Sequence, residues 1–121
     1  MDKQNLITGL RSLADELVPF TQNVQGGSRV WNGTAYVTTE LRKLDSYALM
    51  WWSTLTAIAD LLSAQRNPLE PEQIQQLRKK LFGGMGSFND YCIDENHCGE
   101  EAKSANARLN EKRTKLFGIF P

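Results

Sequence analysis

The most regular feature of the sequence is a series of apolar residues spaced alternately by four and three positions. The series comprises Val37, Leu41, Leu44, Ala48, Trp51, Leu55, Ile58 and Leu62. This spacing places the side chains on one face of a long helix that packs lengthwise against other helices. Every residue from Tyr47 to Trp52 is apolar. A helix that is apolar all round is buried all round, so we expect this helix to be the central one.

The length of this helix sets two alternatives for the shape of the molecule. If it ran from Thr34 to Gln65 it would be about 48 Å long. A compact chain of this size is only about 35 Å across. Either the bundle is elongated or the helix breaks, and Asp45–Ser46 is the favoured break because both residues prefer helix caps.

Three further segments have helical spacing of apolar residues. Residues 3–18 carry leucines at 6, 10, 13 and 17, and Pro19 should end that helix. A second segment opens at Pro71, presents Ile74, Leu77 and Leu81, and should be capped at Gly83–Gly84. The third spans 99–117, with Ala102, Ala105, Leu109 and Leu116 facing inward.

These segments predict the fold class. The chain has 121 residues, which suits a single helical domain over 1–121. We expect an all-α, four-helix, bundle-like fold built around residues 34–65. More than half of the residues should be helical, and no sheet should exceed two strands.

Residues 29–38 allow two interpretations. Asn32-Gly33 lies between Val30-Trp31 and Tyr36-Val37, an arrangement typical of a short β-hairpin, because both turn residues tolerate positive φ. Alternatively, Asn32 or Thr34 caps the long helix. The second interpretation is favoured, since an isolated two-stranded hairpin is only marginally stable.

A glycine-rich segment follows the helix that begins at Pro71. It reads FGGMGSFND over residues 82–90, with Gly83, Gly84 and Gly86 inside four residues. Glycine is expected where the backbone needs positive φ or a close approach. The favoured interpretation is a tight connector, in which Ser87 caps a short helical turn within 87–94 and Asp90 lies in its first turn. The alternative is a nest of backbone N–H groups that binds an anion.

The string GGMGSFND, with Trp51-Trp52 on the preceding helix, carries a resemblance. It resembles a segment of small bacterial proteins that form a domain-of-unknown-function family, over residues 47–117. The resemblance implies a bacterial source and assigns no catalytic residue.

Cys92, His97 and Cys98 lie close together in the sequence, near Asp94. Their spacing is not that of a zinc site, so we predict no metal and no cofactor. No signal peptide is apparent in the first twenty residues, which contain Asp2 and Lys3. We therefore expect a cytoplasmic protein in which both thiols are reduced.

The charge pattern gives no general attraction to nucleic acid or to a membrane. Fourteen basic and fourteen acidic residues cancel. The last helix has a mildly basic face, which is typical of a solvated helix, and nucleic-acid binding would need aromatic residues on that face. We therefore expect neither nucleic acid nor membrane as a partner.

Two classes of function remain. The favoured class is a non-catalytic bacterial binding protein, of immunity or regulatory type, that occupies the surface of another protein. Trp52, one position off the apolar stripe, and Trp31 are its candidate contacts, and a homodimer is also compatible. The alternative is a small enzyme or anion-binding module that uses Gly83–Asp90, through Gly84, Gly86, Ser87 and Asp90. His97, the only histidine, would then be the available base.

Overall fold

Residues 2–22, 29–31, 33–34, 36–38, 40–83, 88 and 100–120 are described by the computed structural model. Within these residues the chain forms four α-helices: α1 (Lys3–Leu17), α2 (Glu40–Ala64), α3 (Pro71–Phe82) and α4 (Glu100–Ile119). They contain 15, 25, 12 and 20 residues, which is more than half of the chain. The prediction of an all-α, four-helix, bundle-like fold is confirmed.

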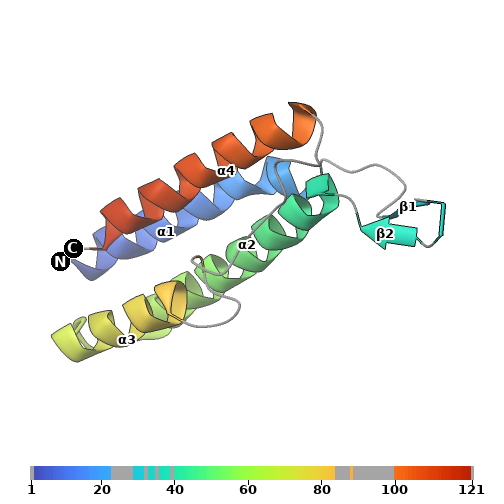
Figure 1. Ribbon diagram of the computed structural model, residues 1–121. Helices are drawn as coiled ribbons and strands as arrows, with labels where there is room; N and C mark the ends of the chain where they lie inside the picture. The colour runs from blue at the N-terminus through green and yellow to red at the C-terminus, as the bar shows by residue number, and fades with distance from the viewer. Residues whose placement is uncertain are drawn as a thin grey trace.

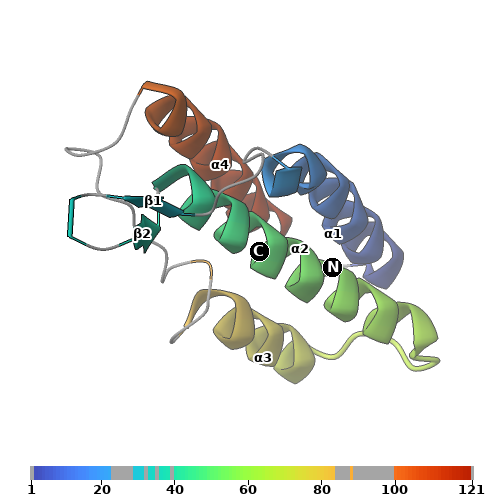
Figure 2. The same cartoon turned by 90° about the vertical axis from the view of Figure 1, so that its right-hand side faces the viewer.

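The helices form an elongated bundle (Figure 1). α1 and α4 lie side by side and run in opposite directions, and α3 returns antiparallel to the second half of α2. Figure 2 shows α2 between α3 and the α1–α4 pair, which is the central position predicted for it. Both chain ends lie at the end of the bundle where α1 begins.

α2 is continuous through Asp45 and Ser46, so the predicted break there is wrong. Asp45 is buried, and the adjacent Leu44 and Ala48 are fully buried. Packing of this stretch outweighs the weak preference of aspartate and serine for helix caps. The helix is therefore about 38 Å long, and the elongated shape is the correct alternative.

A short hairpin precedes α2. β1 (Arg29–Trp31) pairs antiparallel with β2 (Tyr36–Thr38), in a register that joins Val30 to Val37. Gly33, in the connection, has a φ of +99°. α2 begins only at Glu40, so the favoured interpretation, with Asn32 or Thr34 as its cap, is wrong. The positive φ that glycine accepts at low cost supports the hairpin instead.

The core contains the apolar faces predicted from the sequence. Its buried residues on α2 are Leu44, Ala48, Trp51, Leu55, Ile58, Ala59 and Leu62. The four leucines of α1 and the predicted inward residues of α4 are also buried, as are Leu77 and Leu81 of α3. The expectation that α2 is buried all round is wrong, because Leu49 and Leu61 are 53% and 60% exposed.

The end of α1 agrees with the sequence. α1 ends at Leu17, and a 3₁₀ turn, η1 (Val18–Gln22), carries the chain through Pro19.

At the start of α1, the Lys3 ammonium donates hydrogen bonds to the carbonyls of Gln65 and Asn67, at 2.6 and 3.0 Å. These carbonyls follow α2, so Lys3 binds the negative end of the α2 dipole and joins the two helices.

Gly83 ends α3 for a reason of space. Its φ is −118°, and its N–H donates to the Lys79 carbonyl oxygen at 2.8 Å. A Cβ at this position would lie 2.9 Å from the same oxygen. Of the two reasons expected for glycine here, close approach is therefore the one that applies.

Gly83→Ala should destabilise the protein by about 1–2 kcal/mol, because a backbone carbonyl has to shift. Gly118→Ala is the matched control, since a Cβ there meets nothing within 4 Å. It should leave stability unchanged or raise it by up to about 1 kcal/mol through helix propensity. Urea unfolding of both variants tests the assignment, and equal effects would contradict it.

Candidate functional site

The predicted site residues fall into two groups. Gly84, Gly86, Ser87 and Asp90 lie outside the described residues, as do Cys92, His97 and Cys98 and all of the predicted turn at 87–94 except Phe88. Trp31 belongs to β1, at the end of the bundle where α2 begins (Figure 1). Trp52 lies on α2, where it is partly buried and packs against the core.

Two exposed apolar residues, one on α2 and one after α1, accompany Trp52. Leu49 precedes it by three residues on α2, so the two side chains are neighbours on the helix surface. Val18, which follows α1, is 37% exposed. We call Val18, Leu49 and Trp52 the α1–α2 patch.

The pairing of α1 with α2 brings Val18 to the level of Trp52. The Arg11 guanidinium contacts the Asp60 carboxylate at 3.2 Å across the outer side of the two antiparallel helices. Val18 follows Arg11 by seven residues, and Trp52 precedes Asp60 by eight. Equal rise along antiparallel helices therefore places Val18 and Trp52 at nearly the same height. Residues seven apart share a helix face, so Val18 lies on the same side of α1 as Arg11.

The α1–α2 patch has the composition of a protein contact surface. Tryptophan is enriched among residues that dominate binding energies, and neighbouring aliphatic groups exclude water around it. Trp51, on the side of α2 opposite Leu49, and Leu55, one helical turn after Trp52, are both fully buried, so the backbone beneath the patch is fixed. Sequence spacing identified Trp52 but missed Leu49 and Val18, because their exposure depends on which sides of α1 and α2 are covered by other parts of the fold.

Phe88 anchors the glycine-rich segment in the core. Its ring is 2% exposed and stacks on Trp51, with centroids 4.5 Å apart and planes at 18°. Its N–H donates to the Leu81 carbonyl at 2.7 Å, and its carbonyl accepts from Arg113 Nε at 2.7 Å. One residue therefore joins α2, α3 and α4. Phe88 was missed in the sequence because a lone phenylalanine among glycines has no periodicity.

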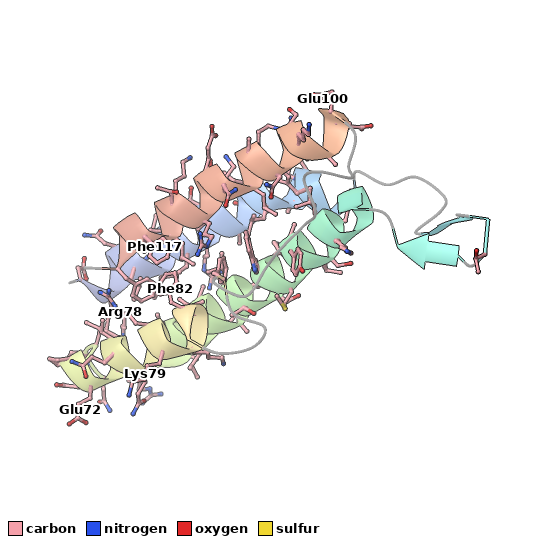
Figure 3. The ribbon with its side chains drawn as sticks, in the orientation of Figure 1. Glu72, Arg78, Lys79, Phe82, Glu100 and Phe117 are labelled. Atoms are coloured by element: carbon pink, nitrogen blue, oxygen red, sulfur yellow. The ribbon has the colours of Figure 1, made fainter. Side chains whose placement is uncertain are left out.

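An aromatic contact closes the space between α3 and α4. Phe82 and Phe117 stack with centroids 4.3 Å apart, and Figure 3 shows the two rings directed toward one another. Arg113 lies over the Phe117 ring at 5.4 Å. Phe82 and Arg113 thus both contact the ring of Phe117, although this residue is 43% exposed.

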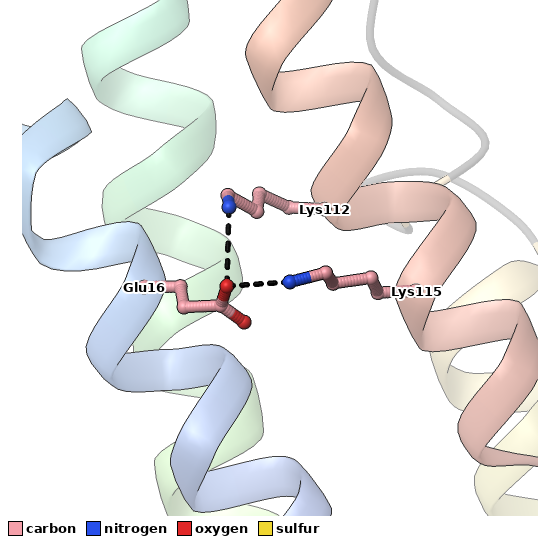
Figure 4. Close-up of polar contacts among 3 residues, drawn as sticks. All are labelled: Glu16, Lys112 and Lys115. Carbon is pink, nitrogen blue, oxygen red and sulfur yellow. Dashed lines mark hydrogen bonds and ion pairs between the residues drawn. The ribbon is translucent and has the colours of Figure 1, made fainter.

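A charged cluster joins α1 to α4. The ammonium groups of Lys115 and Lys112 contact the same Glu16 oxygen, Oε1, at 2.6 and 3.2 Å (Figure 4). The hydrogen bond from Lys115, followed by that from Lys112, lowers the pKa of Glu16 below its ordinary value of 4.5, against the opposing effect of burial. Two cations thus hold one anion, which leaves one positive charge in excess.

The lowered pKa predicts how Glu16 affects stability as pH changes. A depressed pKa stabilises the fold above the pKa of the unfolded chain, and this contribution is lost as pH falls through the folded value. Glu16→Gln should therefore cost about 0.5–1 kcal/mol at pH 7, a modest amount because the carboxylate is about a third exposed. The cost should shrink progressively as the pH falls below 4.5.

Urea unfolding at several pH values measures this effect. Glu111→Gln is the matched control, because Glu111 is an exposed glutamate of the same helix as the two lysines. It should change stability little at any pH. A Glu16→Gln cost that is the same at pH 3 and pH 7 would show that the ion pairs are not its source.

In the part of the chain that the structure describes, no group of three or more His, Cys, Asp or Glu side chains is placed to hold a metal ion. In the same part, no helix combines the length and apolar character needed to cross a bilayer.

Part of the chain is similar to a known protein family. Residues 50–99 match the model of a family described as a domain of unknown function, DUF6966. Neither the curated proteins nor the solved structures include a match to the chain. The matched stretch contains Trp51, Trp52, α3 and the whole GGMGSFND string, so it includes both partners of the Trp51–Phe88 stack. Over residues 50–99, the chain is thus similar to an uncharacterised domain family.

Proposed function

We propose that this chain is a non-catalytic binding protein of the bacterial cytoplasm, of immunity or regulatory type, and that it acts by occupying the surface of another protein. The observation that carries the proposal is the α1–α2 patch, in which partly buried Trp52 lies one helical turn from exposed Leu49 and at the same level along the bundle as exposed Val18.

The energetics of such a patch support binding. A partner that covers Leu49 and Val18 removes apolar surface from water at roughly 25 cal/mol per Å². Trp52 already packs against the core, so little side-chain freedom remains to be lost on binding. A rigid aromatic beside exposed aliphatic groups is the arrangement typical of a binding hot spot.

The placement of Phe88 supports a structural role for the glycine-rich segment. Its ring is in the core, and both its N–H and its carbonyl are bonded to α3 and α4. We therefore propose that Gly83–Asp90 serves as a connection between helices rather than as an anion site.

Site-specific cross-linking in a bacterial host that encodes this protein tests the proposal. A photo-reactive amino acid is placed at position 49 in one strain and at position 61 in another. Both positions are exposed leucines of α2, on different sides of the helix, so they form a matched pair. We expect a discrete cross-linked protein from position 49 and none from position 61.

The cross-link should also depend on the neighbouring residues of the patch. Trp52→Ala and Val18→Asp should each lower the yield of the cross-linked protein. Arg78→Gln, at an exposed residue of α3, should not. Cross-linking that is equal at positions 49 and 61, or absent at both, would contradict the assignment of the patch.

A further inference from the structure

A groove lies between α1 and α4, on the side of α1 away from the Arg11–Asp60 contact. It has a volume of about 380 Å³ and is lined by Gly9, Ser12, Leu13, Glu16, Lys115, Gly118 and Ile119. This volume falls within the range of small-molecule sites, which is roughly 300–1,000 Å³. The groove is separate from the α1–α2 patch and shares none of its residues.

Two glycines keep the groove open. A Cβ on Gly9 would touch the Ile119 side chain at 3.5 Å, and a Cβ on Gly118 would meet nothing within 4 Å. The absence of a side chain at position 118 leaves free space beside the apolar groups of Leu13 and Ile119. An apolar body of a few carbon atoms fits this part of the groove.

The other end of the groove is cationic. Lys115 lines it, and its ammonium shares Glu16 Oε1 with that of Lys112 (Figure 4). An ammonium has three donors, and each lysine uses one on Glu16, so donors remain for a second anion. The Lys115 side chain is 55% exposed, which makes it accessible from solvent.

We propose that this groove binds a small amphipathic monocarboxylate. Its carboxylate lies beside Lys115, while Lys112 pairs with the Glu16 that lines the same end, and its short apolar chain lies over Leu13, Ile119 and the open space at Gly118. The single positive charge left after Glu16 is counted matches one negative charge on the ligand. This proposal does not depend on the proposed function, because the groove is separate from the α1–α2 patch.

Titration of ¹⁵N-labelled protein with acetate, butanoate and hexanoate tests the proposal by NMR. Saturable shifts are expected at the amides of Gly9, Ser12 and Gly118. Affinity should rise up to about fourfold for each methylene that enters the groove, which is the equivalent of about 0.8 kcal/mol. Hexanamide, which lacks the charge, should bind at least fivefold more weakly than hexanoate.

Three variants separate the two ends of the site. Lys115→Gln should weaken hexanoate at least fivefold, whereas Glu16→Gln should strengthen it about threefold to tenfold by removing a like charge. Gly118→Leu should abolish saturable binding by filling the open space while leaving the lysines in place. The proposal would be overturned if hexanoate bound no more tightly than acetate or inorganic phosphate, or if Gly118→Leu left hexanoate binding unchanged. Either result would mean that the site binds anions by simple ion pairing.

Discussion

Trp51→Ala should destabilise the protein by about 3–5 kcal/mol, the largest loss expected from a single substitution in this chain. Trp51 is fully buried at the middle of α2 and stacks on Phe88. Its removal leaves a cavity that the surrounding helices cannot fill, because α1, α3 and α4 are also held by their own contacts. For a domain of this length the loss is a large fraction of the total free energy of unfolding.

Trp52→Ala is the matched control for this experiment. It removes the same side chain one residue later, at a position that is only partly buried. The expected loss is about 1–2 kcal/mol, because part of its surface is already in water. Urea unfolding followed by circular dichroism measures both. Equal losses would mean that the buried face of α2 has been assigned incorrectly.

Phe88→Ala should cost about 3–4 kcal/mol, although it lies in a segment rich in glycine rather than in a helix. The substitution removes a ring that is 2% exposed and breaks the stack with Trp51. Phe88→Leu keeps most of the apolar volume and should cost only about 1–2 kcal/mol. Phe117→Ala, at a ring that is 43% exposed, should also cost less than Phe88→Ala.

A double-mutant cycle links the two largest predictions. Because Trp51 and Phe88 are in contact, the loss in the double variant should be smaller than the sum of the single losses, by about 0.5–1.5 kcal/mol or more. Additive losses would contradict the stack. A Phe88→Ala loss below about 1 kcal/mol would show that the segment is not anchored in the core.

The sequence predicted the elements with long, regular apolar spacing. The stripe from Leu44 to Leu62 and the inward residues of α1 and α4 are buried as expected. It failed where two local preferences compete, as at Asn32-Gly33, because turn and helix-cap residues are the same types. It also failed at Asp45, where burial between Leu44 and Ala48 decides the outcome, and burial is a tertiary property.

The candidate site was less predictable than the fold. Trp52 could be identified because it lies one position off the stripe. The exposure of Leu49 could not, since the run from Tyr47 to Trp52 is apolar throughout and does not indicate which side is left uncovered. Val18 joins the patch only because α1 and α2 pair with Arg11 beside Asp60. The excess positive charge of the cluster formed by Glu16, Lys112 and Lys115 depends on contacts between residues almost a hundred positions apart.

The most direct test of the proposed function is the affinity for the cross-linked partner once it has been purified. Isothermal titration of that partner should give at least a thirtyfold higher Kd for Leu49→Glu than for the unmodified protein, as expected for a hot-spot residue. Leu61→Glu, at a leucine of the same helix that is at least as exposed, should change the Kd less than threefold. Equal Kd values for Leu49→Glu and Leu61→Glu would contradict the proposal that the α1–α2 patch is the binding surface.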